Sequence, residues 1–135
     1  MIQSTELKDL ILGWYENINS GEILGPVERF FSRQQGFLAI GNAPDEWYES
    51  FASIFSAYKG TASQGPLEVK VRDLNAYSEG TVGWTLDRVT LKLPNGSEIP
   101  FRHTFVFHKE NGEWKIVHAH YSVSVSNEDI GYPSG

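Results

Sequence analysis

Three polar side chains in the second half of the sequence, Arg88, His103 and Tyr121, are of types that orient a ligand or transfer a proton. An arginine binds an anion, a tyrosine hydroxyl donates a hydrogen bond, and a neutral imidazole accepts a proton. His103 can act as a general base if a carboxylate orients it, and it is the one candidate for a catalytic residue. The alternative for Arg88 is a structural ion pair with a helix carboxylate such as Glu49.

Two further histidines, His118 and His120, are two positions apart, which places both on one face of a strand. Two imidazoles can bind zinc, but a metal site needs at least a third ligand, and no spacing in the sequence supplies one. We therefore expect two hydrogen-bonded histidines, no metal and no cofactor. The chain has no cysteine, no Gly-x-Ser-x-Gly elbow and no phosphate-binding glycine pattern, which disfavours nucleophilic hydrolases and nucleotide enzymes.

Charge and length exclude other classes of protein. The net charge is −6, from 17 acidic and 11 basic residues, and no Lys/Arg run suits a nucleic acid, so we expect no nucleic-acid partner. A chain of 135 residues predicts one domain, residues 1–135. No segment approaches the ~20 apolar residues of a membrane span, and the first residues lack the basic and apolar parts of a signal peptide. The sequence thus predicts no membrane partner and a cytoplasmic location.

The spacing of apolar residues predicts three helices in the first half of the chain. Ser4 caps the first helix, whose apolar stripe runs from Leu7 to Ile18. Pro26 begins a short second helix, and a short strand follows at 36–41. Pro44 begins the third helix, whose stripe consists of Trp47, Phe51, Ile54, Phe55 and Tyr58.

The second half changes to strands of alternating pattern, separated by turns, at about 67–77, 81–93, 98–109 and 113–125. Strands so close in sequence must pair antiparallel, because a parallel crossover needs about a dozen residues. Helices followed by an antiparallel meander define an α+β fold in which the helices fill the hollow of a strongly curved sheet.

Two hairpin registers decide which side chains face that hollow. A three-residue loop at Glu110-Asn-Gly112 places His103, with its neighbours Phe101 and Phe105, on the inner face. At Pro94-Asn-Gly96 a three-residue loop would set Arg88 against Arg102, so we predict a loop of different length. That choice turns Arg88 inward and Asp87 outward, and the predicted ligand-binding residues are then Trp14, Trp47, Phe51, Trp84, Arg88, His103, Phe105 and Tyr121.

The outer face of the sheet is expected to carry an apolar patch. A monomer would leave this patch in water, and contiguous exposed apolar surface usually marks an interface. A second copy of the chain is the simplest cover, so the sequence predicts a homodimer through the outer sheet face. The patch is expected to consist of Val89, Leu91, Val106, Trp114 and Ile116.

Two segments carry a resemblance to a known family: Gly41-Asn-Ala-Pro-Asp-Glu-Trp47 and Asn111-Gly-Glu-Trp-Lys-Ile-Val-His-Ala-His-Tyr-Ser122. They resemble the SnoaL-like branch of the nuclear transport factor 2-like superfamily, which includes ketosteroid isomerase-like folds. The last strand is similar to the association domain of calcium/calmodulin-dependent protein kinase II. The resemblance implies a cone-shaped fold with a pocket at its wide end, and a dimer or larger assembly.

The resemblance also bears on the ligand. The kinase association domain has a pocket arginine where Arg88 stands, a histidine where Trp47 stands, and arginines where Phe105 and Tyr121 stand. Three aromatic residues in place of polar ones imply a flatter and more apolar ligand. The ketosteroid isomerases use a pocket carboxylate as base, for which the predicted register offers no match, since it turns Asp87 outward.

Two hypotheses remain open at this point. The first is a small-molecule-binding SnoaL-like protein with a mostly apolar pocket; if it is an enzyme, proton transfer in an isomerisation or dehydration of a cyclic or aromatic substrate suits the pocket. The second is a non-enzymatic assembly or sensory module whose pocket is filled by side chains and whose outer sheet face serves oligomerisation.

Overall fold

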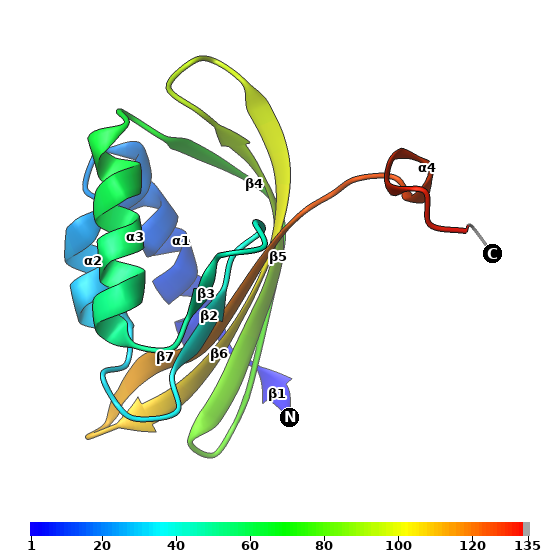
Figure 1. Ribbon diagram of the computed structural model, residues 1–135. Helices are drawn as coiled ribbons and strands as arrows, with labels where there is room; N and C mark the ends of the chain where they lie inside the picture. The colour runs from blue at the N-terminus through cyan, green and yellow to red at the C-terminus, as the bar shows by residue number, and fades with distance from the viewer. Residues whose placement is uncertain (134–135) are drawn as a thin grey trace.

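The computed structural model describes residues 1–133 as helices packed against the concave face of one curved sheet (Figure 1). The sheet has seven strands in the order β1-β4-β5-β6-β7-β2-β3 and does not close into a barrel. Three helices, α1 to α3, cover its inner face, and a short fourth helix, α4 (Asn127–Ile130), projects from the body near the C-terminus. The predicted α+β fold is confirmed.

Helix α1 (Thr5–Asn19) forms the floor of the hollow. Ser4 caps it as predicted, because its side chain accepts a hydrogen bond from the backbone N–H of Leu7 at 3.1 Å. Apolar side chains recur at helical spacing on the face toward the sheet, and this stripe is buried. Its buried members are Leu7, Ile11, Trp14, Tyr15 and Ile18.

The third helix begins later than predicted. Helix α2 spans Leu24–Phe30, and α3 spans Phe51–Ser63 with Ser50, rather than Pro44, at its start. Between them β2 (Leu38–Ile40) and β3 (Trp47–Tyr48) form a hairpin that pairs Ile40 with Trp47. The prediction that Trp47 lies on the helix is wrong, because the capping box of Ser50 and Ser53 supplies a stronger helix start than Pro44.

The four long strands form the predicted antiparallel meander: β4 (Glu68–Glu79), β5 (Val82–Lys92), β6 (Glu98–Glu110) and β7 (Glu113–Val123). The two-residue strand β1 (Ile2–Gln3) adds to β4, and β2 pairs parallel with β7 on the other side. No helix within residues 1–133 is long and apolar enough to cross a membrane.

The hairpin between β5 and β6 has the register that the sequence argument rejected. Its loop is Pro94-Asn95-Gly96, closed by a 2.8 Å bond from Leu93 N to Ser97 O, with Gly96 at φ 88°. Such a three-residue loop with a left-handed glycine sets Lys92 against Glu98 and Arg88 against Arg102. The like charges are tolerated because both side chains are exposed and each has a polar partner of its own, Asp73 or Ser122.

The hairpin between β6 and β7 also differs from the prediction. Glu110 pairs with Glu113 around a two-residue turn whose residues, Asn111 and Gly112, both have positive φ, 52° and 81°. Val117 is then an extra residue, because Val106 pairs with His118 and Phe107 with Ile116. This bulge reverses the facing of the strand at Val117. Even-numbered side chains before Val117 and odd-numbered side chains after it therefore share the inner face.

The predicted outer patch is wrong because of these two registers: the β5–β6 loop turns Val89 and Leu91 inward, and the β6–β7 register turns Trp114 and Ile116 inward. Val89, Trp114 and Ile116 are buried in the core, and Leu91 packs against it. Of the five predicted members only Val106 lies on the outer face, where it is paired with Trp84.

Candidate functional site

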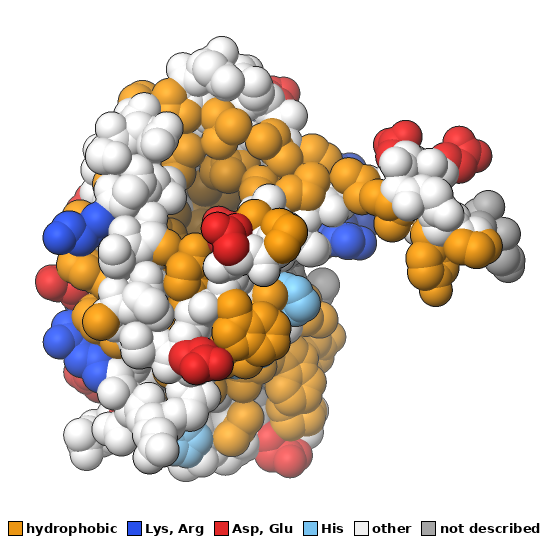
Figure 2. All heavy atoms as spheres, viewed as in Figure 1, with side chains coloured by type: hydrophobic (Ala, Val, Ile, Leu, Met, Phe, Trp, Pro, Cys, Tyr) orange, Lys and Arg blue, Asp and Glu red, His pale blue; other side chains and the backbone are white. Residues whose placement is uncertain are grey.

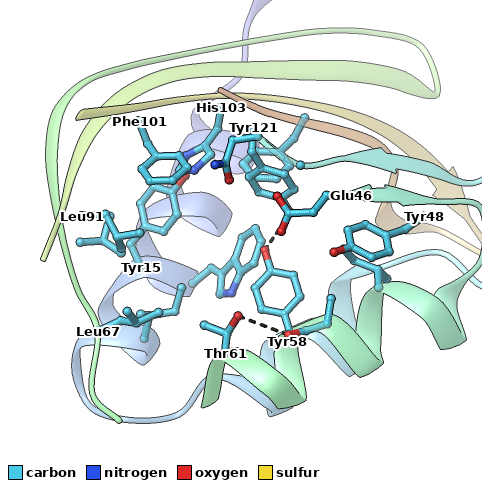
Figure 3. Close-up of a pocket in the computed structure, with 18 residues that line it drawn as sticks. Tyr15, Glu46, Tyr48, Tyr58, Thr61, Leu67, Leu91, Phe101, His103 and Tyr121 are labelled. Atoms are coloured by element: carbon cyan, nitrogen blue, oxygen red, sulfur yellow. Dashed lines mark hydrogen bonds between the residues drawn. The ribbon is translucent and has the colours of Figure 1, made fainter. Parts of the chain in front are cut away.

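A cavity of about 170 Å³ lies between α1, α3 and the concave face of the sheet. Figure 2 shows the hollow from one side, with hydrophobic side chains around it and an acidic side chain at its border. Its wall is mostly aromatic and aliphatic (Figure 3). Its polar side chains are those of Tyr15, Asn42, Glu46, Tyr48, Tyr58, Thr61, His103 and Tyr121. An apolar cavity of ~150 Å³ holds benzene, so this one has room for a single ring.

One end of the cavity is a hydrogen-bonded cluster of Tyr15, Asp87 and His103. Asp87, on β5, is fully buried, and its side chain has no exposed surface. Its carboxylate oxygens contact the hydroxyl of Tyr15 and, at 2.9 Å, Nδ1 of His103. The Tyr15 hydroxyl also lies 2.9 Å from that Nδ1. Asp87 is 72 positions and His103 is 88 positions from Tyr15 in the sequence. Packing of helix α1 against the neighbouring strands β5 and β6 brings the three side chains together.

The cluster specifies which nitrogen of His103 carries the proton. An ionised carboxylate only accepts hydrogen bonds, so Tyr15 and the Nδ1–H of His103 both donate to Asp87. Burial, and then the charge of Asp87, raise the pKa of Tyr15, which keeps it a donor. Within residues 1–133 the other nitrogen, Nε2, forms no hydrogen bond and remains free to accept a proton from a molecule in the cavity.

A second pair of polar groups lines the cavity from α3 and β7. The hydroxyls of Tyr58 and Tyr121 are 2.7 Å apart, and the two side chains reach toward each other from opposite walls (Figure 3). Burial raises the pKa of both, so both stay protonated. Because one hydroxyl donates to the other, the accepting hydroxyl keeps a free proton. The Tyr121 ring lies 5.2 Å from the His103 ring, so the tyrosine pair adjoins the imidazole.

The structure divides the eight residues predicted to bind a ligand into two groups. Four of them line the cavity: Trp14, His103, Phe105 and Tyr121. The other four lie away from its lining: Trp47, Phe51, Trp84 and Arg88.

Trp84 and Arg88 face outward because of the β5–β6 register. Trp84 lies on the outer sheet face beside Tyr77, with ring centroids 6.1 Å apart. The Arg88 guanidinium pairs with Asp73 at 2.5 Å, on the solvent side. The predictions that Arg88 points inward, or pairs instead with Glu49, are both wrong.

Trp47 and Phe51 lie outside the lining for a different reason. Trp47 is 57% exposed on β3, where its indole N–H donates to Glu49. Phe51 opens α3 and stacks on Phe55, while the Arg33 guanidinium lies 4.1 Å from its ring centroid. The short β3 strand and the later helix start turn both rings away from the hollow.

Asp87, the carboxylate that His103 requires, was not predicted as a site residue from the sequence, and neither were Tyr15 and Tyr58. One feature of the sequence predicts the inward position of Asp87. A favourable pair of opposite charges, Lys92 against Glu98 across the loop, gives the observed register. In that register Asp87 pairs with His103, and both face the helices.

The two histidines on β7 have structural surroundings. Nδ1 of His118 lies 2.9 Å from the carbonyl oxygen of Leu38, on the parallel neighbour β2. The His118 and His120 rings are 6.4 Å apart. No group of three or more potential metal ligands exists in the described part of the chain.

The fold defined by this curved sheet and its helices is that of nuclear transport factor 2-like proteins. A nuclear transport factor 2-like protein of unknown function from Pseudomonas putida KT2440 superposes with a TM-score of 0.79 at 15% identity, over 95% of this chain and 94% of that one. A superfamily protein from Salmonella enterica serovar Typhimurium gives 0.73 at 19% identity, over 90% of each chain.

A protein from Xanthomonas campestris, assigned as a calcium/calmodulin-dependent protein kinase II association domain, gives 0.71 at 18% identity, over 88% of this chain and 86% of that one. The family model of the SnoaL-like domain matches residues 7–126. The chain therefore belongs to the SnoaL-like domain family, and the resemblance noted in the sequence is confirmed. No curated protein matches the chain.

Proposed function

We propose that the protein binds a small cyclic carbonyl compound in the cavity and moves a proton on it. The observation that carries this proposal is the position of His103, held by the buried Asp87 on one side and bordering an apolar cavity on the other. A carboxylate that fixes the tautomer of an imidazole is a recurrent arrangement for general base catalysis.

The arrangement suits removal of a proton next to a carbonyl group. Nε2 of His103 takes the proton from the α-carbon, and the C–H electron pair forms the enolate. The free hydroxyl proton of the Tyr58–Tyr121 pair donates a hydrogen bond to the enolate oxygen, where the negative charge develops. In a β,γ-unsaturated ketone the enolate extends over the double bond, and return of the proton from His103 to the γ-carbon gives the conjugated isomer. In a β-hydroxy ketone, loss of the hydroxyl group as water, protonated by His103, gives a dehydrated product.

Hydrogen exchange with solvent tests the proposal without knowledge of the natural substrate. We expect the protein to catalyse deuterium incorporation at the saturated carbon next to the carbonyl of 2-cyclohexen-1-one or cyclohexanone in D₂O, measured by proton NMR. His103→Gln removes the base and is expected to slow the catalysed exchange by about 10²-fold or more. Exchange no faster than in buffer, or an unchanged rate with His103→Gln, would show that the cluster is not a proton-transfer site.

We also propose that the protein is a homodimer through the outer sheet face. The support is an apolar group on this face, consisting of Tyr77, Val82, Trp84, Leu86 and Val106, in which Val82 and Leu86 are each 42% exposed. Oligomerisation through this face is also the basis of the alternative function, a non-enzymatic assembly or sensory module. Sedimentation should then give a mass above the 15.2 kDa of one chain. A cytoplasmic location stays a prediction.

A further inference from the structure

The turn between β2 and β3 places a carboxylate in the cavity wall. Glu46 is half-buried and lines the cavity together with Gly41, Asn42 and Tyr48. Figure 3 shows its side chain directed among the aromatic rings, from the β2–β3 turn and not from the helix and strands that carry Tyr15, Asp87 and His103. It is a charged group in a wall that is otherwise mostly apolar.

The backbone of the turn holds this side chain in place. The backbone N–H of Ala43 donates to Oε1 of Glu46 at 2.7 Å, and Gly41 N donates to the carbonyl of Glu46 at 2.8 Å. A Cβ atom at Gly41 would lie 2.6 Å from Cβ and 2.7 Å from Oε1 of Glu46. Position 41 must therefore be glycine for the side chain to fold across it.

Among the residues that the structure describes, no cationic side chain pairs with the Glu46 carboxylate. The residues that line the cavity include neither lysine nor arginine. Within residues 1–133 Glu46 forms no ion pair, and its second oxygen, Oε2, accepts no hydrogen bond. Arg88, which was expected to supply positive charge here, is on the other face with Asp73. A partly desolvated carboxylate without a counter-ion favours a ligand that brings the positive charge with it.

We infer that Glu46 selects ligands carrying a protonated amine, so that the substrate class is small ring compounds with an ammonium group and not carboxylates or phosphates. The inference rests on the proposed function, because it assumes that the cavity takes a ligand. The ammonium group binds Oε2 of Glu46, and the ring occupies the apolar part of the cavity. The net charge of −6 acts in the same direction, since it repels anionic ligands at long range.

Three probes of equal ring size test the inference at neutral pH: benzylammonium, benzyl alcohol and benzoate. Their dissociation constants are measured by titration of the ¹⁵N-labelled full chain, followed by NMR. A hydrogen bond to a charged group should make benzylammonium bind about tenfold tighter than benzyl alcohol, with benzoate the weakest. Glu46→Gln keeps an oxygen that can accept from Ala43 N–H, so the turn is retained while the charge is lost, and the tenfold preference should disappear.

Asp45→Asn is the matched control, because Asp45 belongs to the same turn but is exposed and outside the cavity lining. It removes the same charge and should leave the preference unchanged. A preference that survives Glu46→Gln, or falls equally with Asp45→Asn, overturns the inference. Equal affinity for the three probes overturns it as well, while the ligand-binding proposal stands. Failure of all three probes to bind overturns both.

Discussion

The hydroxyl of Tyr15 offers a direct measure of how much the buried cluster contributes to stability. Tyr15→Phe keeps the ring, which is 4% exposed and stacked against Trp14 at 5.9 Å, and removes only the donor to Asp87. A hydrogen bond to a charged group contributes about 1.5–3 kcal/mol net. Asp87 would keep His103 as a donor, so its charge is not left unpaired. We therefore expect a loss of about 2 kcal/mol in the free energy of unfolding.

Urea denaturation measures this loss, as a lower midpoint at unchanged slope. The matched control is Tyr58→Phe, which also removes a buried hydroxyl, but one bonded to the neutral Tyr121 at 2.7 Å. A bond between neutral groups contributes about 1 kcal/mol, so Tyr15→Phe should destabilise about twice as much. If Tyr15→Phe costs no more than Tyr58→Phe, Asp87 is not an ionised acceptor, and the tautomer assigned to His103 loses its basis.

Three further predictions concern stability and assembly. Burial raises the pKa of Tyr58 above the ordinary value of about 10. Above about pH 10 the unfolded chain loses this proton before the folded chain does, so the free energy of unfolding should fall by about 1.4 kcal/mol per pH unit for this group. In urea titrations at a series of pH values, Tyr58→Phe should make this fall less steep. A Cβ at Gly83 would clash with Leu7 Cδ1, so Gly83→Ala should lower the free energy of unfolding by about 1–3 kcal/mol through overpacking, seen as a lower melting temperature. Gly13→Ala, where a Cβ would meet no atom within 4 Å, should not lower it. Trp84→Glu should reduce the sedimentation mass to that of the 15.2 kDa monomer; an unchanged larger mass would exclude the outer face as the interface.

Much of the fold was predictable from local patterns. The apolar stripe from Leu7 to Ile18 and the cap at Ser4 predict α1, because helix formation depends on residues three and four apart and on the first turn. The alternating strands after residue 67, separated by short turns, predict an antiparallel meander because so short a connection allows no other pairing. The two quoted segments predict the SnoaL-like family, which the match over residues 7–126 confirms.

The site itself depended on features that local patterns do not specify. Along a strand, neighbouring side chains face opposite sides of the sheet. The length of the loop and the position of the bulges decide which of the two faces the helices. A shift of one residue at 94–96 exchanges Arg88 for Asp87 on the inner face, and an extra residue at Val117 brings Ile116 inward together with Tyr121. Contacts formed only in the packed sheet decide among these registers. In the observed register Asp87 accepts hydrogen bonds from Tyr15 and His103, while Arg88 pairs with Asp73 on the solvent side. The sequence thus determined the elements and the family, and tertiary pairing decided which side chains form the cavity.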